Sequence, residues 1–138
     1  KSVVCIGGTY SDVGMDVEDT VRLTLDYANF SVQINLTFWQ KHHERSLSIC
    51  GEEGYLSWDQ DDDFLIEEYF DKAKESTKRV NSNSDNDAMF DLQVKSLIKN
   101  INTIDSKVNM NDAIASMKII EAAKESMKNN TVTKLNID

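Results

Sequence analysis

The sequence predicts an α+β fold, with an open, largely antiparallel β-sheet and helices packed on one face. Two observations predict it. The first half of the chain alternates apolar and polar residues, and the second half holds two segments with apolar residues at helical spacing. Strands that come first and helices that follow are typical of an antiparallel sheet with helices segregated to one side.

The clearest alternation lies in residues 20–27 and 30–38. Successive side chains of a strand point to opposite faces of the sheet. One face is therefore covered, and the other is exposed to solvent or faces a partner. The two strands join at Ala28-Asn29, because asparagine tolerates the left-handed conformation of a tight hairpin. We expect the face covered by the two helices to carry Val21, Leu23, Leu25, Val32, Ile34 and Leu36.

Shorter runs of strand-forming residues predict the rest of the sheet. Val132 and Leu135 suggest a last short strand. Residues 64–79 are ambiguous, because their charges fit a helix while Phe64 opens an apolar run that favours a strand leading into a loop. The remaining strands are expected at residues 3–10, 45–50 and 55–58.

Two helices are expected after the Asn- and Ser-rich segment 81–87. The first covers residues 87–103, and the second runs from Asn111, a candidate cap, to about Asn129. Apolar residues recur at the i, i+3, i+4 and i+7 positions of both segments, which is typical of amphipathic helices. The first stripe is Phe90, Val94, Leu97, Ile98 and Ile101, and the second is Ile114, Met117, Ile120, Ala123 or Lys124, and Met127.

The composition bounds the class of protein. The 138 residues suit one domain over residues 1–138, and the net charge of −9 argues against a nucleic-acid or anionic-membrane partner. No apolar run approaches the ~20 residues of a membrane span, and no signal-peptide pattern is present, so we expect a cytoplasmic location. Cys5 and Cys50 are expected to be reduced structural thiols. Because the chain starts at Lys1 rather than Met, we interpret it as a piece of a longer protein.

No catalytic, cofactor-binding or metal residue can be assigned from the motifs. His42 and His43 could be metal ligands or lie near a ligand cleft, but adjacent extended residues point apart, which favours a solvated connection. The spacing of Asp59, Asp61 and Asp63 starts like a calcium loop but lacks its glycine and glutamate. No glycine-rich phosphate loop follows a strand.

An acidic cluster comes just before the strand at residues 20–27. Asp16, Glu18 and Asp19 could act as a general acid–base group, which would need a shifted pKa and a nearby substrate. A charged turn that opens a strand is the favoured interpretation of the same residues.

Three segments resemble the C-terminal domain of the glucose–fructose oxidoreductase / inositol dehydrogenase / rhizopine-catabolism (Gfo/Idh/MocA) family. Residues 16–21 match an acidic D-x-E-D opening of a strand. Residues 45–59 match R-x-L-x-I-x-G-x-x-G-x-L ending in W-D, and residues 119–126 match a last helix of the form I-I-x-A-A-x-x-S. Residues 40–44 stand where many sugar-nucleotide-type members carry prolines, which leaves the substrate subgroup open.

The resemblance implies an NAD(P)-dependent oxidoreductase that acts on a sugar, inositol or sugar nucleotide. Members bind NAD or NADP in an N-terminal Rossmann domain, and the motifs of that domain do not occur in this chain. We therefore expect these residues alone to be inactive and to bind no cofactor. The alternative is a free-standing α+β ligand-binding or protein-interaction module without dinucleotide chemistry.

The resemblance also implies that the open sheet face helps to wall a substrate cleft and packs against a partner subunit. We expect a homo-oligomer, with His42 and His43 as candidate cleft residues. Its interface would carry Arg22, Thr24, Gln33, Asn35, Thr37 and Trp39, with Ser46 and Ser48 where the register permits.

Overall fold

The computed structural model describes residues 1–60, 64–70, 78–81, 86–100 and 110–137. It confirms the α+β fold, with antiparallel sheets and two helices. Contacts divide the chain into two compact units, Lys1–Lys41 with Ser106–Asp138, and His42–Asp105. A single domain over residues 1–138 stays a prediction.

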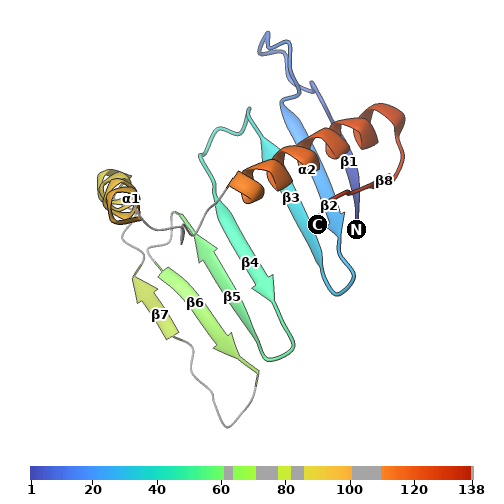
Figure 1. Cartoon of the computed structure of the whole chain (residues 1–138). Coiled ribbons are helices and arrows are strands. Elements are labelled where there is room, and N and C mark those ends of the chain that lie inside the picture. The colour runs from blue at the N-terminus through green and yellow to red at the C-terminus, as the bar shows by residue number, and fades with distance from the viewer. Residues whose placement is uncertain (61–63, 71–77, 82–85, 101–109, 138) are drawn as a thin grey trace. The chain divides into compact units, whose positions relative to one another are not determined.

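The sheet of the first unit has four strands in the order β3-β2-β1-β8, and every neighbouring pair is antiparallel. Their positions follow the alternation in the sequence closely (Figure 1). The strands are β1 (Ser2–Gly8), β2 (Thr20–Asp26), β3 (Ser31–Thr37) and β8 (Thr133–Lys134).

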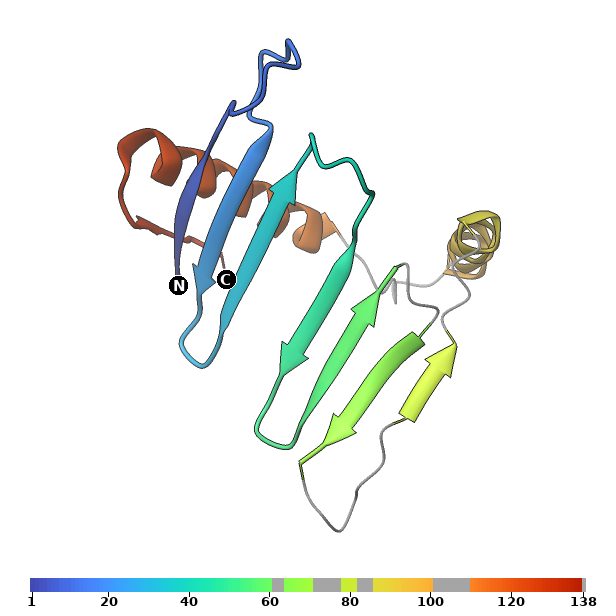
Figure 2. The same ribbon diagram turned by 180° about the vertical axis from the view of Figure 1, so that it is seen from behind.

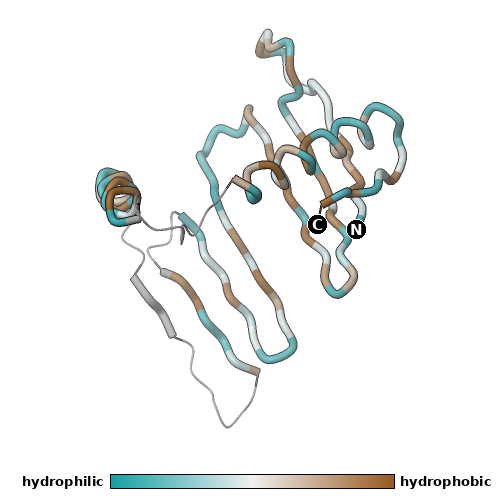
Figure 3. The backbone as a smooth tube through the Cα atoms, viewed as in Figure 1, coloured by the Kyte–Doolittle hydropathy of each residue, from teal (hydrophilic) through white to brown (hydrophobic). Residues whose placement is uncertain are grey.

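Helix α2 (Met110–Asn129) lies across one face of this sheet, and Figure 2 shows the opposite face of β1–β3 with no element of the unit over it. The tube in Figure 3 shows apolar and polar residues alternating along these strands, as a sheet covered on one side requires. The core between sheet and helix consists of Val3, Cys5, Leu23, Leu25, Ala122, Ala123 and Leu135.

Small residues let α2 approach β1 closely. Ala122 and Ala123 face the sheet, and a Cβ atom on Gly7 would lie 3.1 Å from the sulfur of Met127 and 2.6 Å from the Thr20 carbonyl oxygen. A side chain at residue 7 would therefore push the helix and the neighbouring strand away.

Ser126 fastens α2 to the edge of β1. The Cys5 N–H, which lies beyond the short pairing with β8, donates to Ser126 Oγ at 2.9 Å, and this hydroxyl donates to the Thr131 carbonyl at 2.6 Å. The Thr131 N–H in turn donates to the Ser126 carbonyl, while Asn130 has a φ of 51°. This is a Schellman-type ending, with the left-handed residue just after the helix.

The hairpin between β2 and β3 closes differently from the prediction. The Tyr27 N–H donates to the Phe30 carbonyl at 2.9 Å, and the two rings stack at 4.6 Å between centroids. Among the described non-glycine residues, the positive φ falls at Asn130, so the left-handed conformation expected at Asn29 is wrong. The stacked rings and the hydrogen bonds between β2 and β3 close this turn without a left-handed residue.

The second unit contains another antiparallel sheet, in the order β4-β5-β6-β7, where the sequence predicted one sheet for all strands. The strand expected from Phe64 is confirmed, and β7 follows where a loop was predicted. The elements are β4 (Ser46–Cys50), β5 (Gly54–Asp59), β6 (Phe64–Tyr69), β7 (Lys78–Asn81) and α1 (Asn86–Asn100).

The apolar stripe predicted on α1 is exposed, with Phe90, Val94, Leu97 and Ile98 all more than half accessible. Ile101 lies outside the described residues. Helix α2 lies on the face predicted to be covered, where Leu23 and Leu25 are buried, but Leu36 is 58% exposed, so its predicted covering is wrong. The covering of this face by α1 stays a prediction. Neither described helix is long and apolar enough to cross a membrane.

Candidate functional site

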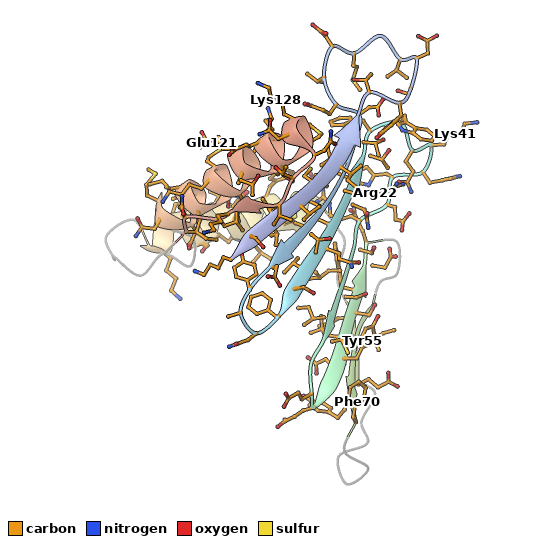
Figure 4. The ribbon with its side chains drawn as sticks, turned by 90° about the vertical axis from the view of Figure 1, so that its right-hand side faces the viewer. Arg22, Lys41, Tyr55, Phe70, Glu121 and Lys128 are labelled. Atoms are coloured by element: carbon orange, nitrogen blue, oxygen red, sulfur yellow. The ribbon has the colours of Figure 1, made fainter. Side chains whose placement is uncertain are left out.

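The face of β1–β3 opposite α2 is called the open face, and its residues form straight rows across the three strands. In the central row Ile6, Arg22 and Asn35 are direct register partners, and Val4, Thr24 and Gln33 form the next row. Figure 4 shows Arg22 on the side of the sheet away from α2, whose outer surface carries Glu121 and Lys128. The alternation thus separates this polar, lightly charged face from the core.

Trp39 belongs to the open face although it follows the end of β3. Its indole N–H donates to Thr20 Oγ1 at 2.9 Å, and this hydroxyl lies 3.3 Å from that of its register partner Thr37. The hydrogen bond fixes the ring at the end of the rows while leaving the side chain 55% exposed. A rigid aromatic ring that is anchored yet accessible is typical of an interface anchor.

The structure brings together the residues predicted for this face and adds two. Arg22, Gln33, Asn35 and Thr37 lie in its rows, whereas Ser46 and Ser48 belong to β4 of the other sheet. Val4 and Ile6 were missed, and Ile6 is 66% exposed. The β1 segment is apolar on both faces, so its sequence did not reveal which side chains face outward.

Asp19 is buried and holds the loop between β1 and β2. Its carboxylate accepts hydrogen bonds from the Tyr10 N–H at 3.0 and 3.1 Å, the Ser11 N–H at 2.7 Å and the Ser11 hydroxyl at 2.6 Å. The Ser11 hydroxyl, with the backbone donors and Thr20, lowers the pKa of Asp19 to about 2. A carboxylate fixed in its ionised form by its own loop favours the charged-turn interpretation over acid–base chemistry.

A groove of about 470 Å³ lies between α2 and the covered face of β2 and β3, and is called the α2 groove. Its floor includes Val21, Leu23, Ile34 and Leu36, and Glu18 and Lys124 are charged groups on its lining. Burial, followed by the negative charge of Glu18, raises the pKa of the Cys5 thiol, which also borders it.

The second sheet carries a small polar network on one face. Tyr55 OH lies 3.1 Å from Ser48 Oγ, and hydrogen bonds with Ser48 and then Ser57 lower the pKa of Tyr55. Ser48 and Ser57 are register partners, so all three groups share the face marked by Tyr55 in Figure 4. The side chains are accessible, and no substrate-binding geometry accompanies them in the described residues.

The other candidates stay separate from these features. His42 and His43 are exposed in the segment before β4, and no group of His, Cys, Asp and Glu suited to a metal ion occurs in the described part of the chain. Of the calcium-like aspartates, Asp61 and Asp63 lie outside the described residues. Both cysteines are free, with Cys5 buried and Cys50 exposed.

Comparison with known proteins identifies the family to which this arrangement corresponds. Residues 2–135 match the family described as "Oxidoreductase family, C-terminal alpha/beta domain", the Gfo/Idh/MocA C-terminal family. No curated protein matches the sequence significantly.

Solved structures share the fold at low sequence identity. A levoglucosan dehydrogenase, in complex with NADH and L-sorbose, superposes with a TM-score of 0.81 at 14% identity over 99% of this chain and 45% of its own. A Klebsiella pneumoniae protein classed as an oxidoreductase gives 0.66 at 19% identity, over 100% of this chain and 44% of its own. YvaA from Bacillus subtilis, also classed as an oxidoreductase, gives 0.69 at 16% identity, over 99% and 45%. The chain thus spans less than half the length of these proteins.

Proposed function

Because the chain belongs to the oxidoreductase family as its C-terminal alpha/beta domain, we propose that it serves as the substrate and oligomerisation domain of an NAD(P)-dependent oxidoreductase. The single observation that carries this proposal is the match over residues 2–135. The dinucleotide would bind to a preceding Rossmann domain, of the kind whose glycine-rich turn is missing from these residues.

The substrate we propose is a sugar, an inositol or a sugar nucleotide. The levoglucosan dehydrogenase neighbour, whose structure holds NADH and L-sorbose, supports this class. The exposed side chains of His42 and His43 are suited to hydroxyl-rich molecules, since hydroxyl groups require hydrogen-bonding partners when they leave water. In this proposal His42 and His43 contribute to the wall of the substrate cleft and perform no chemical step.

The open face is proposed as the contact with a second copy of the chain. It combines Ile6 and uncharged polar residues in its rows with Trp39 at their end, and Arg22 is the cation within the rows. Interfaces favour aromatic and arginine side chains and exclude most other charges from their centre. In a two-fold dimer, Trp39 and Gln33 would approach their own copies or each other's.

Trp39→Glu should convert a dimer or larger species to monomer at tens of micromolar protein. The new carboxylate would be buried in a mostly neutral contact. Its loss of hydration would cost more free energy than the contact could return. Sedimentation equilibrium is the measurement, at physiological ionic strength, where charges are screened beyond about 8 Å and the net charge opposes association less than at low salt.

Val132→Glu is the matched control, because Val132 is an exposed aliphatic residue of the same unit that lies outside the rows of the open face. It should leave the association constant unchanged. A wild-type chain that stays monomeric would count against the interface. Association that ignores Trp39→Glu would place it on another surface.

A further inference from the structure

Two opposite charges lie four residues apart on the open face of β2. Arg22 belongs to the central row, and Asp26 lies in the row of its register partners Ser2 and Ser31. Both charged side chains are exposed, and no ion pair or side-chain hydrogen bond to either occurs in the described part of the chain. At about 3.4 Å per residue they are separated by about 14 Å, which is too far for an ion pair within one strand.

The charge of this side of the sheet differs from that of the whole chain. The net charge is −9, yet the outward side chains of β1, β2, β3 and β8 comprise two cations and one carboxylate. The second cation is Lys134, at the edge of the sheet and two strands away from Asp26. Two copies of an acidic chain therefore repel each other less through this face than through the rest of their surface.

A two-fold axis decides which residues of two open faces meet. Sheets that pack face to face lie about 10 Å apart, with their strands within about 30° of each other. An axis along the central row, or along β2 itself, would set Arg22 against its own copy. An axis along the row of Val4, Thr24 and Gln33, called the Thr24 row, lies midway between the two charges. It sets Arg22 of each chain against Asp26 of the other.

We propose that two copies of the chain recognise each other through reciprocal Arg22–Asp26 ion pairs, with the two-fold axis along the Thr24 row. This inference rests on the proposed function and specifies its contact between copies. Gln33 then approaches its own copy, whereas Trp39 lies opposite the partner's β2–β3 turn. The ion pairs determine the register of the dimer, since complementary charges at an interface exclude wrong arrangements more than they add affinity.

Single charge reversals test this recognition. In Arg22→Asp two carboxylates would meet on each side of the axis, and in Asp26→Arg two guanidinium groups would meet. Each variant should associate at least about tenfold more weakly than wild type in sedimentation equilibrium, because like charges brought together at an interface repel. Both should keep the wild-type midpoint of urea denaturation at a concentration where the chain is monomeric, since both side chains are exposed.

A mixture of the two variants separates this recognition from a general effect of charge. A heterodimer would place the two new carboxylate contacts of one chain against guanidinium groups of the other. An equimolar mixture should therefore associate at least about tenfold more strongly than either variant alone, and the double variant Arg22→Asp/Asp26→Arg should dimerise like wild type. Both single-variant chains keep a net negative charge, so attraction between net charges does not explain such a recovery. If these variants do not fold, Arg22→Glu and Asp26→Lys repeat the comparison.

Lys128→Asp is the matched control, because it makes the same change of net charge on the outer surface of α2 (Figure 4). It should leave the association constant within about threefold of wild type, as expected for an exposed charge away from the contact. An equal loss in Lys128→Asp and Arg22→Asp would overturn the ion pairs, since net charge alone would then account for both.

The outcomes distinguish this inference from the proposed function. Single reversals that leave association unchanged, while Trp39→Glu abolishes it, would overturn the axis and leave the proposed contact between copies intact. Folded variants that stay monomeric in the mixture would also overturn the axis, because the restored charge pairs would then have no effect. A wild-type chain that is monomeric at tens of micromolar would contradict both the ion pairs and the proposed contact.

Discussion

Leu23→Ala should lower the free energy of unfolding by about 2–5 kcal/mol, since it removes a large buried side chain and the surrounding structure relaxes only partially to fill the gap. Leu23 is central on β2, between register partners Cys5 and Ile34, and belongs to the cluster that joins the sheet to α2. Urea unfolding followed by far-UV circular dichroism measures the loss.

Leu36→Ala is the matched control for this prediction. It has the same residue type on the same sheet face, but its side chain is 58% exposed at the end of β3. We expect it to cost about 1 kcal/mol or less, because truncation removes little buried area. If the two losses were equal, or reversed, the burial gradient across this face would be wrong.

Asp19→Asn should also destabilise the protein at neutral pH. The carboxylate accepts every hydrogen bond described for the loop at Tyr10 and Ser11, and an amide replaces one acceptor oxygen by a donor. The N–H groups of Tyr10 and Ser11 would then compete for a single oxygen. The midpoint of urea denaturation at pH 7 should fall.

The pH dependence of this effect has a defined sign. Interactions of the folded state lower the pKa of Asp19 to about 2, whereas an unfolded aspartate titrates near ~3.9. The stabilisation is therefore fully present above about pH 4 and is lost as the pH falls towards about 2. The difference in midpoint between wild type and Asp19→Asn should shrink over that interval. Asp26→Asn, at an exposed position at the end of β2, is the control and should show little change. A difference in midpoint between wild type and Asp19→Asn that is constant with pH would contradict the stabilising role of the ionised Asp19 carboxylate.

The strands could be predicted from the sequence because the pattern that specifies each strand is local. Alternation of period two placed β2 and β3 within one or two residues, and the same pattern separated Leu23 from Arg22 by face. What could not be predicted depends on distant partners. The bond between Cys5 and Ser126 joins residues 121 positions apart, and the division of strands into two sheets depends on which edges pair. Neither the long-range hydrogen bond nor the choice of paired edges produces a periodic pattern in the sequence.

The candidate site shows the same limit. Gln33 and Asn35 were placed on the open face because alternation decides it, while Trp39 required the hydrogen bond to Thr20 to place it securely. Ile6 was missed because both faces of β1 are apolar. The α2 groove could not be anticipated either, because it depends on where α2 packs along the sheet rather than on which residues are apolar.

These residues belong to the oxidoreductase family as its C-terminal domain, and we propose that the cofactor site lies in another part of the polypeptide. Titration with NADH and NADPH, by calorimetry, tests it most directly. The isolated chain should show no binding up to millimolar cofactor, because it has no glycine-rich strand-to-helix turn to hold a pyrophosphate. The longer polypeptide of the whole reading frame should bind one of the two. A dissociation constant in the low micromolar range for the isolated chain, or no binding by the longer polypeptide, would contradict the account.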